Sequence, residues 1–208
     1  AQPHRQARGL GRFIGASGAF TGKIMKKLFA IATLCTGPAF ADPLDLIDYA
    51  AIFAQNADSV EVLSDTRSAL AVGDVILLRD PSEPREFTGI DESGEAAVGC
   101  FVSILATIES ALLACEVSLP PAQSDVQATY TNEVLAFYAA NVAPVSDRAT
   151  VQARFDALVA SQIAGARPFC ASFDVVTDLA DRLFVPESRA EVSDMMSVPR
   201  LPVSNPCL

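Results

Sequence analysis

Two acidic residues in one apolar segment have a spacing suited to carboxylate chemistry. Glu109 and Glu116 are seven residues apart, about two helical turns, so a helix would place both side chains on one face. Paired carboxylates can cleave glycosidic bonds, one acid protonating the leaving oxygen while the other attacks or activates water. A sugar cleft usually also needs aromatic platforms, and the chain has no Trp and three Tyr. A carboxylate-based hydrolase is therefore an alternative hypothesis, and no catalytic residue is assigned.

A second acidic cluster lies in a turn-like stretch. The sequence Asp91-Glu92-Ser93-Gly94-Glu95 groups the oxygen ligands that hard cations prefer around a glycine. It lacks the residue order and the distant bidentate Glu of a calcium-binding EF-hand loop. An acidic surface turn is the favoured interpretation, and a calcium-dependent module is a further alternative. Three nearby arginines are expected to neutralise neighbouring acids: Arg67, Arg79 and Arg85.

Two tyrosines are the other side chains that could line a ligand pocket. Tyr130 and Tyr138 are eight residues apart, on the same expected helical stripe as Val134. Packing in the core, with the hydroxyl groups reaching a polar edge, is the favoured interpretation.

Residues Met25 to Ala41 (MKKLFAIATLCTGPAFA) have the three parts of a bacterial secretory signal peptide. Two lysines follow Met25, a short apolar core comes next, and Ala39-Phe40-Ala41 forms an A-x-A cleavage site. Cleavage is predicted between Ala41 and Asp42, which indicates a periplasmic or secreted protein. Residues 1–24 show no apolar period and are interpreted as a non-structural leader or a translation extension.

Cleavage would change the chemistry of the chain. Residues 42–208 contain 25 acids and nine arginines but no Lys and no His, giving a formal net charge of −16. This charge opposes binding to nucleic acid and to anionic lipid head groups. Without His or Lys there is no familiar nucleophile-base pair, Schiff base or His-containing zinc site. The inventory argues against an enzyme, and it predicts neither a cofactor nor a metal ligand set.

Four cysteines follow the predicted cleavage site: Cys100, Cys115, Cys170 and Cys207. An even number of cysteines in an oxidising compartment predicts two disulfides, and no CxxC pair indicates redox or zinc chemistry. If residues 96–116 form one helix, Cys100 and Cys115 are too far apart to bond and must pair with the other two. If that segment folds back as two strands, the pairs become Cys100 with Cys115 and Cys170 with Cys207.

Apolar periodicity predicts helices over much of the chain. In 96–117, apolar residues recur at steps of three and four, and no turn residue lies between 101 and 115, so a helix is favoured over strands. This segment is apolar enough to raise the question of a membrane span. A span would place Glu109 in hydrocarbon, so a buried helix is expected and no integral membrane segment after cleavage. Other helices are predicted over 42–56, 124–142, 146–164 and 172–185.

Local signals place the ends of these helices and the remaining elements. Ser124-Asp125 and Ser146-Asp147 are predicted caps, and Gly165 is a predicted stop. Short strands are predicted around 60–63, 72–79 and 87–90, the last in the loop 80–94. The tail 198–208 contains three prolines and is predicted to be extended and held by Cys207.

The fold class predicted is predominantly α, with a possible α+β character. Antiparallel helices are expected from about 96 to 184, with a small β element around 60–90, in one disulfide-stabilised domain spanning 42–208. We expect an exported acidic protein that acts by binding. It would be an accessory subunit of another envelope protein or a carrier of a small ligand.

Overall fold

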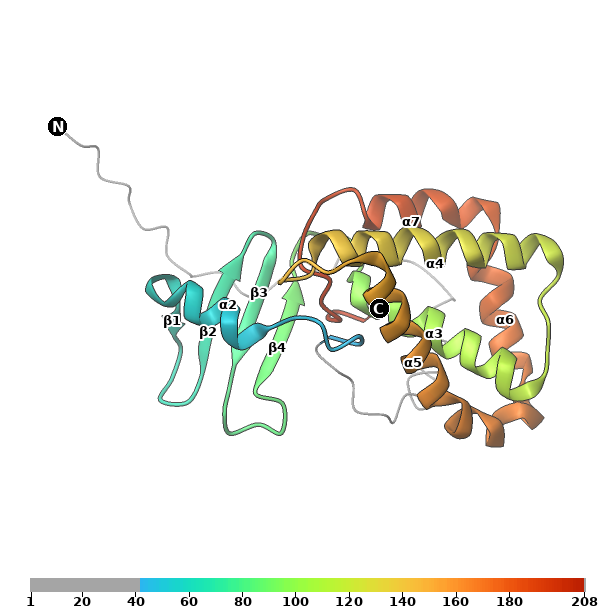
Figure 1. Ribbon diagram of the computed structural model, residues 1–208, viewed down its shortest axis with the longest axis horizontal. Helices are drawn as coiled ribbons and strands as arrows, with labels where there is room; N and C mark the ends of the chain where they lie inside the picture. Colours follow the sequence, from blue (N-terminus) through green and yellow to red (C-terminus); the bar gives the residue numbers. More distant parts are fainter. Residues whose placement is uncertain (1–41, 208) are drawn as a thin grey trace, which may run out of the picture. The chain divides into compact units, whose positions relative to one another are not determined.

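The most apolar stretch of the sequence forms one 18-residue helix, α3 (Val98–Cys115), in the computed structural model (Figure 1). The structure describes residues 42–207, which all lie in one compact unit. The leader 1–24 and the predicted signal peptide 25–41 lie outside the described residues. Twelve residues of α3 are buried, because other helices cover it on several sides, and the helix prediction for 96–117 is confirmed.

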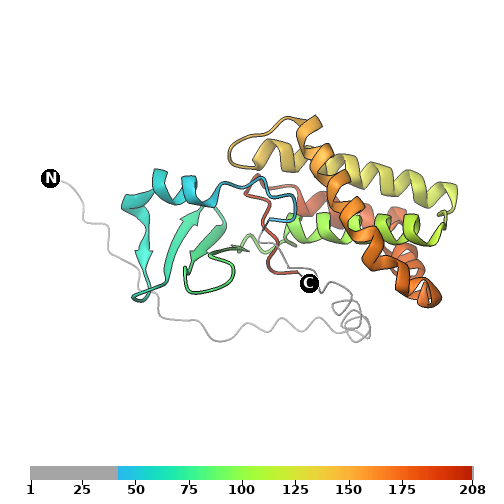
Figure 2. The same ribbon diagram turned by 60° about the horizontal axis from the view of Figure 1, so that its bottom comes forward.

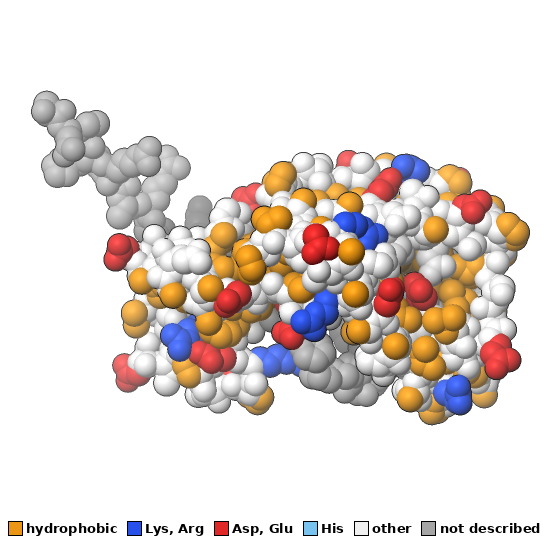
Figure 3. Space-filling model, in the orientation of Figure 1, with side chains coloured by type: hydrophobic (Ala, Val, Ile, Leu, Met, Phe, Trp, Pro, Cys, Tyr) orange, Lys and Arg blue, Asp and Glu red, His pale blue; other side chains and the backbone are white. Residues whose placement is uncertain are grey.

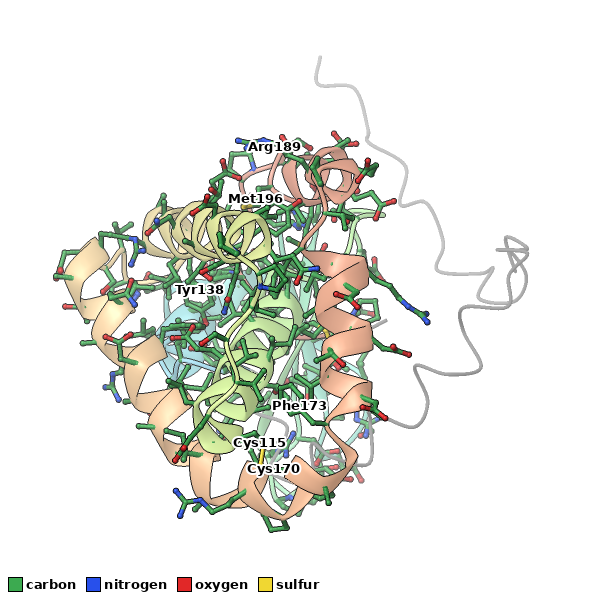
Figure 4. The ribbon with its side chains drawn as sticks, turned by 90° about the vertical axis from the view of Figure 1, so that its right-hand side faces the viewer. Cys115, Tyr138, Cys170, Phe173, Arg189 and Met196 are labelled. Carbon is green, nitrogen blue, oxygen red and sulfur yellow. A yellow bond between two sulfur atoms is a disulfide. The ribbon has the colours of Figure 1, made fainter. Side chains whose placement is uncertain are left out.

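Three helices pack against α3: α4 (Pro121–Asn141), α5 (Arg148–Ala166) and α6 (Asp174–Leu183). Figure 2 shows α4 running alongside α3 in the opposite direction while α5 crosses both obliquely. In Figure 4, α3 lies between α5 and α6, with α4 above it. The predicted helix-rich α+β class is confirmed.

The helix ends agree only in part with the predicted signals. Asp147 caps α5 as predicted, with its carboxylate accepting a hydrogen bond from the Thr150 backbone N–H. The cap predicted at Ser124 is wrong, because α4 begins at Pro121, where proline loses no hydrogen bond. The stop predicted at Gly165 is also wrong, because the chain continues helically into the 3-10 segment η2 (Arg167–Ser172).

A four-stranded antiparallel sheet precedes the helices in the chain, with the strands in sequence order. Its hairpins join β1 (Glu61–Val62), β2 (Ser68–Val72), β3 (Val75–Arg79) and β4 (Phe87–Asp91). The single strand predicted over 72–79 is wrong, because Val72 pairs with Val75 across a two-residue turn. Gly73 provides the positive φ, +59°, that such a turn requires.

One helix, α2 (Tyr49–Gln55), packs on the sheet and is followed by the 3-10 turn η1 (Ala57–Ser59). The rings of Tyr49 and Phe53 each lie 5.7 Å from that of Phe87 in β4. This helix is shorter than the predicted 42–56, because the chain before Asp48 is irregular. Asp48 caps α2 by accepting the Ala51 N–H.

The C-terminal part returns to the sheet through η3 (Pro186–Ser188), α7 (Arg189–Met195) and an extended tail. Asn205 forms a parallel bridge with Ile90 at the edge of β4, and its carbonyl accepts the Asp91 N–H at 2.7 Å. The Gly99 N–H at the start of α3 donates to the Val203 carbonyl at 2.9 Å. The tail therefore joins the edge of the sheet to α3 by hydrogen bonds as well as through Cys207.

Two disulfides connect opposite ends of α3 to distant parts of the chain. Cys100 bonds to Cys207 in the tail, and Cys115 bonds to Cys170 in η2 (Figure 4). These pairs follow from the single helix, which separates Cys100 from Cys115. Such bonds are typical of proteins from oxidising compartments.

Within the described residues, α3 is the one helix long and apolar enough to cross a membrane by length and composition. Most of that segment is buried against the rest of the structure, as is common for the core helix of a folded domain.

Candidate functional site

A cleft of about 450 Å³ lies between α3, α4 and α5. Glu109 and Leu112 line it from α3, Thr131 and Asn132 from α4, and Gln152 from α5. The linker between α3 and α4 closes one side, and Phe155 of α5 contributes an aromatic wall. The remaining lining residues are Leu113, Val117, Ser118, Leu119, Ser124, Gln127 and Ala128.

Glu109 is the one ionisable side chain among the thirteen described residues that line the cleft. Burial raises the pKa of this half-buried carboxyl, and the negative charge of Asp156 raises it further. Within residues 42–207, neither a hydrogen bond nor an ion pair contributes to that pKa. The described fold therefore keeps a partly desolvated carboxylate at the cleft, and none of its own side chains forms an ion pair with it.

Thr131 is a second polar group of the cleft that lacks a partner in the described structure. Its hydroxyl oxygen, Oγ1, is buried and makes no hydrogen bond there. A buried hydroxyl without a partner costs about 1–3 kcal/mol. Thr131 and Glu109 come from different helices, and both residues line the cleft.

Arg148 holds two of the other polar side chains in place. Its guanidinium donates to Gln152 Oε1 at 3.0 Å and to Asn132 Oδ1 at 3.2 Å. The amide of Gln152 in turn donates to Asp156 at 2.7 Å. This network connects α4 to α5 beside the cleft. Arg148 donates its hydrogen bonds here to neutral amide oxygens.

Apolar residues form part of the cleft's outer edge. Leu113 is 56% exposed and Val117 is 36% exposed. This edge is therefore a solvent-exposed apolar surface on the same cleft as the Glu109 carboxylate. On the face shown in Figure 3, acidic side chains lie among apolar ones, and basic side chains are fewer. The arrangement suits a ligand with both an apolar and a polar part.

The structure does not bring the two predicted carboxylates together in this cleft. Glu116 is exposed at the C-terminal cap of α3, with φ +54°, and is not among the lining residues. Only Glu109 faces the cleft, so the spacing of two turns does not produce a two-carboxylate site there.

The first carboxylate of the acidic turn 91–95 forms a structural contact and is not free to bind a cation. Asp91 is buried, and its Oδ2 lies 2.6 Å from Arg200 Nε, while its Oδ1 accepts the Ser93 N–H. Among the residues that the structure describes, no group of three or more His, Cys, Asp and Glu side chains is placed to hold a metal ion. Asp91 therefore acts as a structural partner of the C-terminal tail.

The three arginines around the sheet lie apart from the cleft. Arg67 pairs with Asp80 at 3.2 Å, and Arg79 pairs with Glu86 at 2.6 Å. Arg85 is exposed in the loop between β3 and β4. The two pairs match the predicted neutralisation of neighbouring acids.

Both tyrosines of α4 lie in the core rather than in the cleft. The Tyr130 hydroxyl donates to the Val185 carbonyl at 3.2 Å, and the Tyr138 hydroxyl donates to Asp42 Oδ1. Asp42 also accepts N–H groups from Leu44 and Ile47. Burial raises the pKa of Asp42 despite these hydrogen bonds. The core interpretation of the tyrosines is confirmed, and the role of Asp42 was not foreseen.

Sequence reasoning singled out Glu109 but missed Thr131, Asn132, Gln152 and Arg148. Polar residues on an amphipathic helix are normally solvated, so nothing in the local pattern marks these as members of one site. No family model matches the chain, and neither a curated protein nor a solved structure is significantly similar to it. The functional interpretation therefore depends on the residues of the cleft themselves.

Proposed function

We propose that this chain is an exported protein that acts by binding a small ligand in the cleft between α3, α4 and α5. The observation that carries the proposal is Glu109, a half-buried carboxylate in a cleft of about 450 Å³, where it is the only charged lining residue among residues 42–207. Small-ligand sites are typically concave, largely apolar, and equipped with a few polar groups that fix orientation. Leu112, Phe155 and Leu119 provide the apolar part here.

Export is supported by the signal-peptide pattern of Met25 to Ala41, with predicted cleavage before Asp42. Two disulfides and the acidic composition after that site suit a periplasmic or secreted protein. Of the two binding roles expected from the sequence, the cleft favours the small-ligand carrier over the accessory subunit.

The test is native mass spectrometry of the protein isolated from its own compartment without reducing agent. We expect an N-terminus at Asp42, both disulfides intact, and a small molecule retained at one per chain. The Glu109→Gln variant should retain less of that molecule, and Glu116→Gln on the same helix should retain as much as the wild type. Equal retention by Glu109→Gln would contradict the site, and an uncleaved N-terminus would contradict export.

A further inference from the structure

We infer that the ligand of this cleft is a small organic cation, a protonated amine carried on an apolar body. The inference rests on the proposed binding function and names the class of ligand. Its basis is the charge of the cleft lining. Glu109 is the single ionisable residue among the thirteen that line the cleft in the described part of the chain, and a half-buried carboxylate favours a positive partner.

The charges around Glu109 keep the site negative. On α5, Asp156 adds to the negative charge felt by Glu109. Arg148, on the same helix, directs two of its N–H groups at the amide oxygens of Asn132 and Gln152, and it does not contribute to the Glu109 pKa shift. The lining residues of α4 carry no charge. A cation would therefore meet a carboxylate that the described protein leaves uncompensated, and an anion would be repelled by Glu109 and Asp156.

Thr131 offers a possible second hydrogen-bond acceptor for an ammonium group bound to Glu109. Thr131 Oγ1 is buried without a partner and can accept a hydrogen bond. A primary ammonium has three donors; Oγ1 is covered in the structure, so the Thr131 side chain must turn towards the cleft before an ammonium bound to Glu109 can donate to it. A ligand without a donor would leave Thr131 unsatisfied.

The apolar lining residues of the cleft indicate what the uncharged part of the ligand should be. Phe155, Leu112 and Leu119 line the wall of the cleft, and Leu113 and Val117 form an exposed apolar edge. Phe155 and Leu112 are already buried in the protein, so the gain comes from covering Leu113, Val117 and the half-buried Leu119, at about 25 cal/mol per Å² of apolar surface. A compact hydrated cation such as a metal ion would gain nothing from this wall, which favours an amine on a hydrocarbon or aromatic frame.

The experiment compares three probes of similar shape and different charge: 2-phenylethylamine, 2-phenylethanol and phenylacetate. Binding is measured at pH 7 by chemical shift changes of the amide groups of α3, α4 and α5 in the full mature chain. We expect a Kd for the amine at least ten-fold lower than for the alcohol, with the weakest binding for phenylacetate. Raising the salt concentration should reduce the preference for the amine.

Three variants test the role of each group. Glu109→Gln should reduce the preference for the amine over the alcohol to about two-fold or less, and Glu116→Gln should keep it within two-fold of the wild-type preference. Thr131→Val should weaken binding of the amine more than that of phenylacetate. These variants change polar groups and leave the core side chains intact, and their thermal unfolding is measured alongside to confirm folding.

Each outcome bears on one of the two proposals. Equal binding of the amine and the alcohol, a preference for phenylacetate, or no response to any probe would overturn the cationic ligand. A neutral or anionic molecule retained in a Glu109-dependent way in native mass spectrometry would also overturn it, yet leave the binding function standing. Retention of no molecule by the isolated protein would instead count against the binding function itself.

Discussion

Arg200 and Asp91 form a buried ion pair between the C-terminal tail and the last strand of the sheet. Arg200 Nε lies 2.6 Å from Asp91 Oδ2, and each side chain is 1% exposed. The guanidinium also donates to the carbonyls of Met195, Val198 and Ala96. These hydrogen bonds connect the tail to β4, to the segment that leads into α3 and to the end of α7.

Breaking this pair on one side should be much more harmful than removing both charges. Arg200→Met and Asp91→Leu should each lower the free energy of unfolding by about 3–5 kcal/mol, because each leaves a buried charge unpaired. The double variant should cost clearly less than the sum. Urea unfolding without reducing agent measures this while Cys100 and Cys207 remain bonded. Arg79→Met is the exposed control and should cost less than about 1 kcal/mol, since the Arg79–Glu86 pair is solvated. Additive losses for Arg200→Met and Asp91→Leu would contradict the coupling.

Glycine at the start of α3 should be required by the tail. A Cβ atom on Gly99 would lie 2.6 Å from the Pro202 carbonyl oxygen, a backbone atom that cannot move aside easily. Gly99→Ala should destabilise the protein by about 1–3 kcal/mol. Gly165→Ala is the matched control, because nothing lies within 4 Å of its added methyl group. It should stabilise α5 by up to about 1 kcal/mol. Thermal unfolding of both variants gives the comparison, and a stabilised Gly99→Ala would show that the tail does not pack closely there.

Glu109 should make stability depend on pH in a defined direction. Its pKa in the folded state is raised above the ordinary value of 4.5, so the folded protein holds this proton more tightly than the unfolded chain. The resulting stabilisation is fully present below pH 4.5 and is lost as the pH rises through the folded pKa. At pH 7 the Glu109→Gln variant should therefore be as stable as the wild type or more stable.

Unfolding free energies of the wild type and Glu109→Gln measured between pH 3.5 and 8 test this effect. The wild-type value minus the variant value should decline above pH 4.5 and then level off. Glu116→Gln controls for the loss of one negative charge from α3. Curves that stay parallel over the whole range would contradict the burial of Glu109.

Replacing Asp42 by its amide should destabilise the protein at pH 7, in contrast to Glu109→Gln. Its two carboxylate oxygens accept the N–H groups of Leu44, Leu46 and Ile47 and the Tyr138 hydroxyl. The Asp42→Asn variant would present an NH₂ group where two of these donors point, so it should cost about 1–3 kcal/mol for each backbone N–H left unpaired. Tyr138→Phe removes one donor only and should cost less. Urea unfolding at pH 7 measures both, and an unchanged stability for Asp42→Asn would refute the contact set.

Cleavage before Asp42 should add a favourable charge at this site. The new α-ammonium group would be attached to the residue that bears the buried carboxylate. Their attraction is stronger in the buried site than in the solvated unfolded chain, so it should lower the pKa of Asp42 more in the folded state. Protein beginning at Asp42 with a free amine should therefore melt at a higher temperature than the same chain with an acetylated amine. The difference should be present at pH 6 and small at pH 9, since an α-amino group titrates near about 7.7–8.0. Identical melting at pH 6 would exclude this role for the N-terminus.

Much of the helical part could be predicted because its signals are local. In 96–117, apolar residues recur every three or four positions because these positions lie on the same buried side of the helix. The Asp147 cap is a contact within a single helical turn. The two-residue turn at Gly73 was missed because Val72 to Leu78 is apolar and rich in β-branched residues, apart from that turn. The early start of α4 was missed because Pro121 is compatible both with a helix end and with a first helical turn.

The sequence by itself determined the helix-rich class, the pattern of a secretory signal and the lack of His and Lys after Ala41, since these are properties of composition and short spacing. Only the tertiary structure decided that Glu109 faces a cleft and Glu116 faces water, and that Asp91 pairs with Arg200 instead of serving as a free ligand. The chain packs residues about 50 to 110 positions apart against one another, as in the bonds of Cys115 to Cys170 and Cys100 to Cys207. Burial and the pairing of charges depend on those long-range contacts, and no local pattern encodes them.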